Sequence, residues 1–193
     1  DYNPEDFIVD EDMVVTLSHG GYIKRNSVSL YRSQKRGGKG VTAAKTKEDD
    51  FVERLYIAST HNYMLFLTNR GRLYWLKVHE VPQAGRMSKG KALVNVLPFD
   101  EGEDVATVLV VKDLSEPERY VVMATRNGIV KRVELAAFQN PRKAGIIAIT
   151  VGEDDELVSA ALTDGQSALI LSSRGGKAIC FKESDVRAMG RTS

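Results

Sequence analysis

The residues best suited to chemistry form one short segment between two stretches that read as strands. This segment consists of Gln34, Lys35, Arg36, Gly37, Gly38, Lys39 and Gly40. Its glycines have no side chains to hold a phosphate away from the backbone, and its three cations supply charge and hydrogen-bond donors. The window 20–47 around it holds no acid and carries a charge of +8, although the whole chain carries only +1. The segment is therefore suited to bind a polyanion.

The other charges are sorted along the chain in the same way. Four windows hold 24 of the 27 basic residues and only four of the 26 acids, namely 20–47, 69–92, 125–145 and 173–193. Repeated basic stretches are the electrostatic pattern expected of a nucleic-acid binder. Mixed charges that only keep a β protein soluble are the less favoured interpretation. Besides the Gln34 to Gly40 segment, the candidate nucleic-acid-binding residues are Lys24, Arg25, Arg32, Lys45, Arg86, Lys89, Lys91, Lys131, Arg132, Arg142, Lys143, Arg187 and Arg191.

The elements that must position these residues are predicted to be hairpins. Four stretches share the plan strand, tight glycine turn, strand, with turn glycines at Gly21, Gly71, Gly128 and Gly176. Asn127-Gly128 is the strongest of these signals because it suits a type I′ turn, which needs positive φ at both central positions. Each complete unit adds an earlier strand, then a basic glycine-containing loop and a further strand, at 40–44, 91–97 or 145–151.

Four strands in roughly 50 residues are typical of a propeller blade. The sequence therefore predicts an all-β fold, a β-propeller or β-pinwheel, in one domain over residues 1–193. We expect an incomplete, open array whose repeat units are approximately 1–44, 45–97, 98–151 and 152–193.

Several middle strands are apolar at every position, for example 64–67 and 121–123, which predicts cover on both faces, as between packed blades. Tyr74 and Trp75 are expected to pack rather than to stack on bases. Cys180 is expected to be a buried, inert thiol. Segments 134–138 and 184–189 could each form one short helical turn.

No catalytic or metal-binding constellation is found in the sequence. The pair Gly38-Lys39 lacks the other residues of a phosphate-binding P-loop, and a degenerate dinucleotide fingerprint here has no βαβ context. The three histidines are scattered, and acidic pairs such as Asp154-Asp155 are expected to be solvated. The apolar runs are too short to cross a bilayer, and the N-terminus is acidic, which favours a cytoplasmic protein without membrane contact.

Residues 34–40 resemble the box QRRGGKG of the C-terminal domain of the bacterial DNA gyrase A subunit, with Lys35 in place of arginine. The stretch 11–24 is similar to the first blade of that family, and 181–190 is similar to its fourth. Lys35 keeps the charge of arginine but lacks its bidentate fork. The resemblance covers essentially the whole chain.

The resemblance implies a β-pinwheel, usually of about six blades, whose basic rim binds and wraps double-stranded DNA. It implies a parent DNA topoisomerase of type IIA in which the catalytic tyrosine lies in the preceding core of the A subunit. The partners implied are the rest of the A subunit together with the ATPase B subunit, in a nucleoid-associated heterotetramer that introduces negative supercoils. This chain itself would bind no metal or cofactor and catalyse nothing, with ATP and Mg bound elsewhere. Two alternatives stay open: the corresponding domain of topoisomerase IV, and a protein-interaction propeller with a basic rim.

Overall fold

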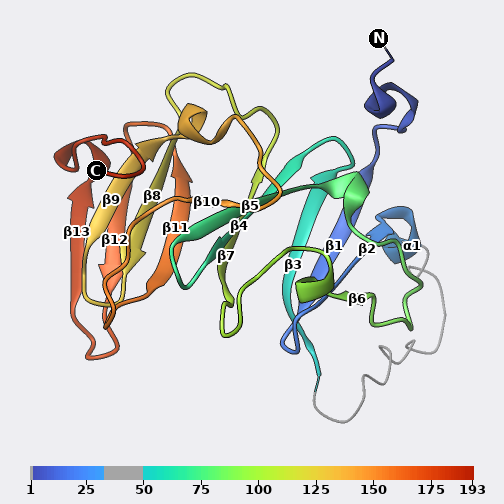
Figure 1. The fold of residues 1–193 in the computed structure, drawn as a ribbon, viewed down its shortest axis with the longest axis horizontal. Helices are drawn as coiled ribbons and strands as arrows, with labels where there is room; N and C mark the ends of the chain where they lie inside the picture. Colours follow the sequence, from blue (N-terminus) through green and yellow to red (C-terminus); the bar gives the residue numbers. More distant parts are fainter. Residues whose placement is uncertain (1, 33–49) are drawn as a thin grey trace. The chain divides into compact units, whose positions relative to one another are not determined.

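The structure, a computed structural model, describes residues 2–32 and 50–193 (Figure 1). The described residues fall into two compact units. The first contains residues up to 64 together with 76–99 and 110–112, and the second contains 65–75, 100–109 and 113–193. The Gln34 to Gly40 segment, Lys45 and the strand predicted at 40–44 lie outside the described residues.

The first unit is built around one antiparallel sheet in the order β3-β1-β2-β6. Its strands are β1 (Asp12–Ser18), β2 (Tyr22–Ser27), β3 (Val52–Ser59) and β6 (Lys91–Ala92). Short helical segments flank them: η1 (Pro4–Phe7), α1 (Ser29–Arg32), η2 (Val78–Glu80) and η3 (Leu93–Asn95). In register, Leu17 lies opposite Ile23 and Thr16 opposite Leu55, so β1 forms the centre of the sheet with β2 and β3 on either side.

The second unit holds most of a four-stranded sheet in the order β10-β5-β4-β7, a sheet β11-β8-β9 and a hairpin β12-β13. The strands are β4 (Tyr63–Thr68), β5 (Arg72–Lys77), β7 (Val105–Val111), β8 (Tyr120–Thr125), β9 (Val130–Glu134), β10 (Ile146–Ile147), β11 (Leu157–Thr163), β12 (Ala168–Ser172) and β13 (Ala178–Lys182). Two 3₁₀ turns, η4 (Leu135–Phe138) and η5 (Glu183–Asp185), begin close to the predicted helical turns.

All four predicted hairpins are present, and each turn glycine has positive φ, from +76° at Gly176 to +90° at Gly128. The type I′ turn predicted at Asn127-Gly128 is wrong, because Asn127 does not have positive φ. Glu118 is the one non-glycine residue with positive φ in the described part of the chain. Instead, the amide of Gly128 donates to the carbonyl of Thr125, and Gly21 does the same with Ser18. The glycine thus ends the turn in a left-handed conformation, as in a three-residue loop with a bulge.

The sheets do not follow the predicted repeat boundaries. Strand β3, placed in the unit 45–97, pairs with β1, and β11, placed in the last unit, pairs with β8. The strands predicted at 91–97 and 145–151 are only two residues long. Each joins the sheet of the hairpin one repeat earlier, β6 on β2 and β10 on β5. The spacing of the sequence repeat is the same whichever strand is taken as the first of a unit. Only the pairing of the strands shows which of them share a sheet.

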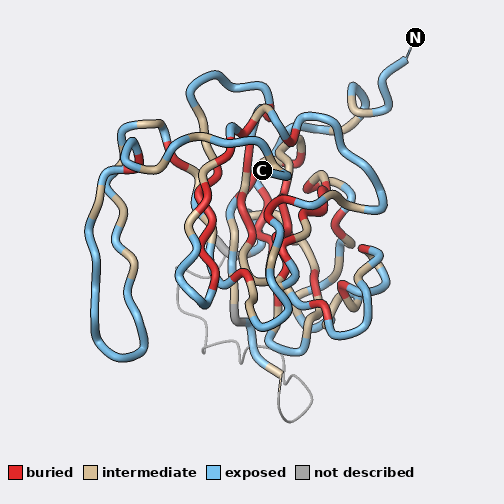
Figure 2. The backbone as a smooth tube through the Cα atoms, turned by 60° about the vertical axis from the view of Figure 1, so that its left-hand side comes forward, coloured by how far each residue is buried: buried red, intermediate tan, exposed pale blue. Residues whose placement is uncertain are grey.

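The core lies in the middle strands, as predicted. Residues 64–67 are fully buried, as are Val121 and Met123, and Tyr74 and Trp75 are also buried. Figure 2 shows the buried stretches of the backbone in red and the exposed stretches in pale blue. The prediction for Cys180 is wrong: it is exposed, because β12 and β13 form a two-stranded hairpin whose residues are mostly exposed.

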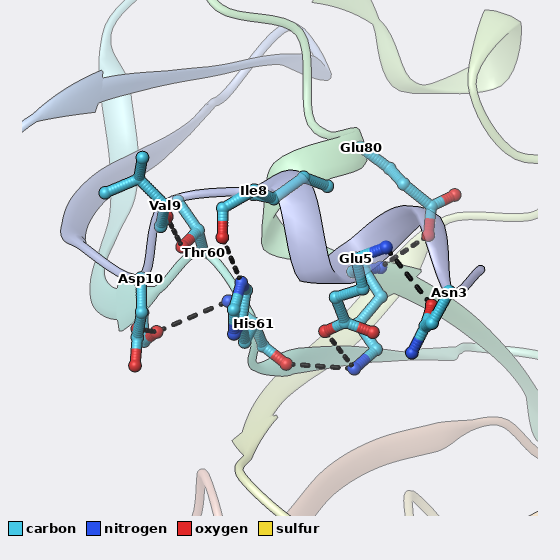
Figure 3. Close-up of polar contacts among 10 residues, drawn as sticks. Asn3, Glu5, Ile8, Val9, Asp10, Thr60, His61 and Glu80 are labelled. Carbon is cyan, nitrogen blue, oxygen red and sulfur yellow. Dashed lines mark hydrogen bonds and ion pairs between the residues drawn. The ribbon is translucent and has the colours of Figure 1, made fainter.

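The N-terminal segment is attached to the turn between β3 and β4, which sequence reasoning missed (Figure 3). The imidazole Nε2 of His61 lies 2.8 Å from the carbonyl oxygen of Ile8, and Thr60 Oγ1 donates to the carbonyl of Val9 at 2.6 Å. Lys77 Nζ lies 3.0 Å from Glu5 Oε1. Most of these contacts use backbone carbonyls, which carry no signal in the residue sequence.

Candidate nucleic-acid interface

Seven of the twelve described candidate cations lie in three loops, here called the basic loops: 83–91, 139–145 and 187–193. The other five lie on β2, α1 and β9. Each loop follows the hairpin and 3₁₀ turn of its repeat, so its position relative to the strands recurs. Four cations in these loops have exposed side chains without an ion-pair or hydrogen-bond partner among the described residues: Lys91, Arg142, Lys143 and Arg187. These side chains are available to an external anion.

The first basic loop is held against β2. The amide of Arg25 donates to the carbonyl of Pro82 at 2.9 Å, and the amide of Ser88 closes a turn onto Gly85 at 3.0 Å. Gly90 has a φ of +82°, and a Cβ added there would stand 2.2 Å from the carbonyl oxygen of Ile23. Only glycine allows this close backbone approach.

The second basic loop is held against β5. Trp75 Nε1 donates to the carbonyl of Phe138 at 2.9 Å, and Arg72 donates to the carbonyl of Ala144. Gly145 has a φ of +71°, and a Cβ there would lie 2.7 Å from Cε1 of Tyr74. The end of this loop therefore packs directly on a buried aromatic ring.

The third basic loop is held against β9. The amide of Met189 donates to the carbonyl of Arg132 at 2.9 Å, and Lys131 Nζ donates to the carbonyls of Arg191 and Ser193. Arg191 Nη1 in turn donates to the carbonyl of Ile147 at 2.9 Å. All three basic loops thus have a defined backbone shape.

Apart from Arg32, the other described candidate cations are engaged within the protein. Lys24 and Arg25 donate to backbone carbonyls, and Lys131 is only 6% exposed. Arg132 Nη1 lies 3.5 Å from a carboxylate oxygen of the buried Glu183. Lys89 stands over the ring of Tyr22, with Nζ 4.9 Å from the ring centroid. Two further candidates are Arg86, which is half-buried, and Arg32, which ends α1.

The acidic segments that connect the hairpins, here called the connectors, were predicted to be only solvated. Two of their aspartates instead accept hydrogen bonds from the hairpin turns. Asp50 accepts hydrogen bonds from the amide of Gly20 at 2.7 Å and from Ser18 Oγ at 2.8 Å. Asp155 accepts from the amide of Asn127 at 2.9 Å, at the equivalent place beside the third hairpin turn. The connectors therefore stabilise the hairpin turns.

Basic residues in the hairpin turns also pair with the connectors. Arg72 lies 3.2 Å from Asp100, and Arg126 lies 3.3 Å from Glu156. Charges that are separated in the sequence are thus partly neutralised in space.

No group of three or more potential metal ligands occurs among the described residues. In the same part of the chain, no helix has the length and apolar character needed to span a bilayer.

A match to a family sequence model identifies the family of the chain and also gives the phase of its repeat. A sequence model for the DNA gyrase C-terminal domain, beta-propeller, matches residues 12–59, 62–112, 119–164 and 168–193. The chain belongs to this family. The first three matches run from the first strand of a hairpin to the strand that pairs with it: β1 to β3, β4 to β7 and β8 to β11. The repeat of the gyrase C-terminal domain therefore has the phase of the sheets, and the predicted all-β propeller class is confirmed.

Curated relatives agree with this membership. The chain is 48% identical over 193 residues to the DNA gyrase A subunit of Clostridium acetobutylicum and 49% identical over 193 residues to that of Klebsiella oxytoca. It is covered completely in both comparisons and spans 23% and 22% of those proteins. The chain thus corresponds to less than a quarter of the length of these gyrase subunits.

Solved structures share the fold. The C-terminal domain of DNA topoisomerase IV superposes with a TM-score of 0.78 at 28% identity, covering 96% of this chain and 56% of that one. The DNA gyrase A C-terminal domain superposes with a TM-score of 0.70 at 29% identity, covering 94% and 58%.

Proposed function

We propose that this gyrase C-terminal domain binds double-stranded DNA through its basic loops and bends the duplex along them. The observation that carries this proposal is the set of four exposed cations without partners, Lys91, Arg142, Lys143 and Arg187, on loops that recur with the repeat. Phosphates are the chemical partners that such lysines and arginines match. The Gln34 to Gly40 segment would add the largest cluster of charge.

Several separate loops favour bending over simple attachment. A single basic patch binds DNA but gains nothing from bending it, whereas repeated patches each add phosphate contacts when the duplex follows them. Smoothly bending 20 to 30 base pairs by 40 to 90° costs about 1–6 kcal/mol, which the added contacts must offset. The loops offer cations and backbone rather than an element that fits a groove, so binding should be largely independent of sequence.

The proposed setting is the gyrase holoenzyme. We assign the chain to the A subunit of an ATP-hydrolysing type IIA topoisomerase, working with the ATPase B subunit in a cytoplasmic, nucleoid-associated heterotetramer. Membership of the family and the relatives at 48% and 49% identity support this assignment. In this setting the chain is a non-catalytic part that presents wrapped DNA for negative supercoiling, with ATP and Mg²⁺ bound elsewhere.

A second candidate is the corresponding role in topoisomerase IV. It is favoured by the TM-score of 0.78 to that enzyme's C-terminal domain, although the identity is only 28%. The two candidate functions differ in the path of the bound DNA. The gyrase role requires the duplex to wrap around the protein with one handedness, whereas the topoisomerase IV role requires only that the duplex is bound.

A topology assay tests the proposal. Nicked circular DNA is incubated with increasing amounts of the protein and religated, and the topoisomers are separated on a gel. A wrap of fixed handedness shifts the distribution in one direction in proportion to bound protein. Binding without a shift would favour the topoisomerase IV role, and the absence of duplex binding at physiological salt would favour a protein-interaction propeller.

A further inference from the structure

Three hairpins carry a pair of large side chains at the same place, the third and fourth residues after the turn glycine. These pairs are Lys24-Arg25, Tyr74-Trp75 and Lys131-Arg132. In each case the pair contacts the basic loop of the next repeat, or the 3₁₀ turn leading into it. The chemistry differs among the three pairs, but each pair has at least one backbone or glycine partner in that loop or turn.

Lys24 is the clearest case. Its Nζ lies 2.7 Å from the carbonyl oxygen of Ser88, 2.9 Å from that of Arg86 and 3.3 Å from that of Gly85. An ammonium group has three hydrogens, so these three acceptors use its full donor capacity. A phosphate could gain a hydrogen bond from Lys24 only by breaking one to the loop.

Arg25 contributes from the adjacent position. Its Nε donates to the carbonyl of Val81 at 2.7 Å, and its Nη2 donates to that of His79 at 3.2 Å. The two side chains together therefore hold the backbone from 79 to 88. Hydrogen bonds from charged donors are roughly twice as strong as neutral ones, which suits them to fix a glycine-containing loop.

Lys131 repeats the arrangement of Lys24 in the second unit. Its ammonium donates to the carbonyls of Arg191 and Ser193, the latter at 3.3 Å. Burial lowers the pKa of both lysines, and a neighbouring arginine on the held loop lowers it further. In the middle hairpin the ring of Tyr74 packs on Gly145, and Trp75 bonds Phe138.

We propose that Lys24 and Lys131 are positioning residues, which shape the first and third basic loops from within, and that neither contacts DNA phosphates. This inference rests on the proposed DNA-binding function for its consequence, because the loops that the lysines hold present the exposed cations. The contact itself, an ammonium enclosed by loop carbonyls, does not depend on that function.

The test compares Lys24→Met and Lys131→Met with Lys91→Met, a change at an exposed lysine without a partner. Methionine keeps most of the apolar stem and removes the ammonium. Hydrogen exchange is measured at the amides of Ser88 and Gly90 for the first variant and of Met189 and Ser193 for the second. We expect exchange about tenfold faster at these amides, the order expected from losing charge-assisted hydrogen bonds, and no change in Lys91→Met.

DNA affinity is then measured at several salt concentrations. A lysine that contacts a phosphate contributes about 0.9 to the slope of log K against log salt. We expect the slope for Lys91→Met to be shallower by about 0.9. For Lys24→Met and Lys131→Met we expect an unchanged slope and a severalfold lower affinity at every salt concentration. A loss of about 0.9 in slope for Lys24→Met or Lys131→Met would overturn the proposal, and so would unchanged exchange at the loop amides.

A further variant separates the loss of hydrogen-bond donors from the loss of charge. Lys24→Gln keeps N–H donors without the charge, so we expect its exchange rates to lie between those of the original protein and Lys24→Met. Rates for Lys24→Gln that equal those of Lys24→Met, with the fold intact, would argue against a hydrogen-bonding role. If the protein binds no duplex DNA, the proposed function fails, but the exchange measurements still decide whether the lysines hold the loops.

Discussion

The hydroxyl of Tyr74 donates a 2.8 Å hydrogen bond to Oε1 of Glu103, and both side chains are buried. The same carboxylate accepts from Thr68 Oγ1 at 2.7 Å and from the amide of Asp100 at 3.1 Å. Burial and the hydrogen bond to Glu103 raise the pKa of Tyr74 to about 12. This network joins the turn between β4 and β5 to the connector that leads into β7.

Replacing Tyr74 with phenylalanine should lower the free energy of unfolding by about 1–3 kcal/mol, because the buried Glu103 carboxylate loses a donor. The pKa of Tyr74 is higher in the folded protein than the usual 10, so its contribution is complete below pH 10 and is lost as the pH rises towards 12. Denaturant unfolding of both proteins from pH 7 to 11.5 measures the difference, which should narrow above pH 10. Tyr2→Phe, at an exposed residue, is the matched control and should change neither quantity.

Glu183 should make stability depend on pH in the opposite direction. Burial alone would raise its pKa, but hydrogen bonds from Thr163 Oγ1 and the amide of Ser167, with the charge of Arg132, leave the pKa below its usual 4.5. A carboxylate with a lowered folded pKa stabilises the protein above pH 4.5, and this contribution is lost as the pH falls through the folded value.

Glu183→Gln should therefore cost about 1–3 kcal/mol near neutral pH and progressively less below pH 4.5. Unfolding by denaturant between pH 7 and 3.5 measures the gap between the two proteins. Glu153→Gln, at an exposed residue, serves as the control. A gap that stays constant down to pH 3.5 would contradict the assigned hydrogen bonds.

The close packing of Gly145 on Tyr74 gives a test of loop shape. Gly145→Ala places a methyl 2.7 Å from the ring at a positive φ, so either the loop or the ring must move. We expect a loss of about 1–3 kcal/mol in stability and weaker DNA binding. Gly152→Ala has open space around its Cβ and no positive φ, so it should leave both unchanged. Equal effects of the two substitutions would show that loop backbone shape is not important.

Hairpin turns were predictable from sequence because a glycine such as Gly71 must adopt positive φ wherever a strand reverses so tightly. The pairing of strands was not predictable from sequence. The stretch that forms β3 could belong to the sheet of β4, which follows it, or to the sheet of β1, with which it pairs. Cations were the other difficulty. The residue type of Lys24 is the same whether its ammonium faces solvent or three carbonyls, and only the folded backbone decides this.

The Gln34 to Gly40 segment stays a prediction from sequence resemblance, and it can be tested in the holoenzyme. Replacing these seven residues with alanines should abolish negative supercoiling while relaxation and decatenation continue, because the wrap is lost before DNA affinity is. Supercoiling, relaxation and decatenation are followed on agarose gels with equal amounts of enzyme. Unchanged supercoiling would refute the role of this segment in wrapping.

The salt dependence of DNA binding tests the interface as a whole. If the basic segments together neutralise about eight phosphates, log K against log salt should have a slope near −7, and a slope shallower than about −3 would exclude a multi-loop interface. Replacing both Arg142 and Lys143 with alanine removes two exposed cations from one loop and should reduce the slope by about 1.8. Lys112→Ala, an exposed lysine outside the basic loops, is the matched control. Because the slope counts displaced counterions, an equal change in both variants would mean that binding follows total charge and not these loops.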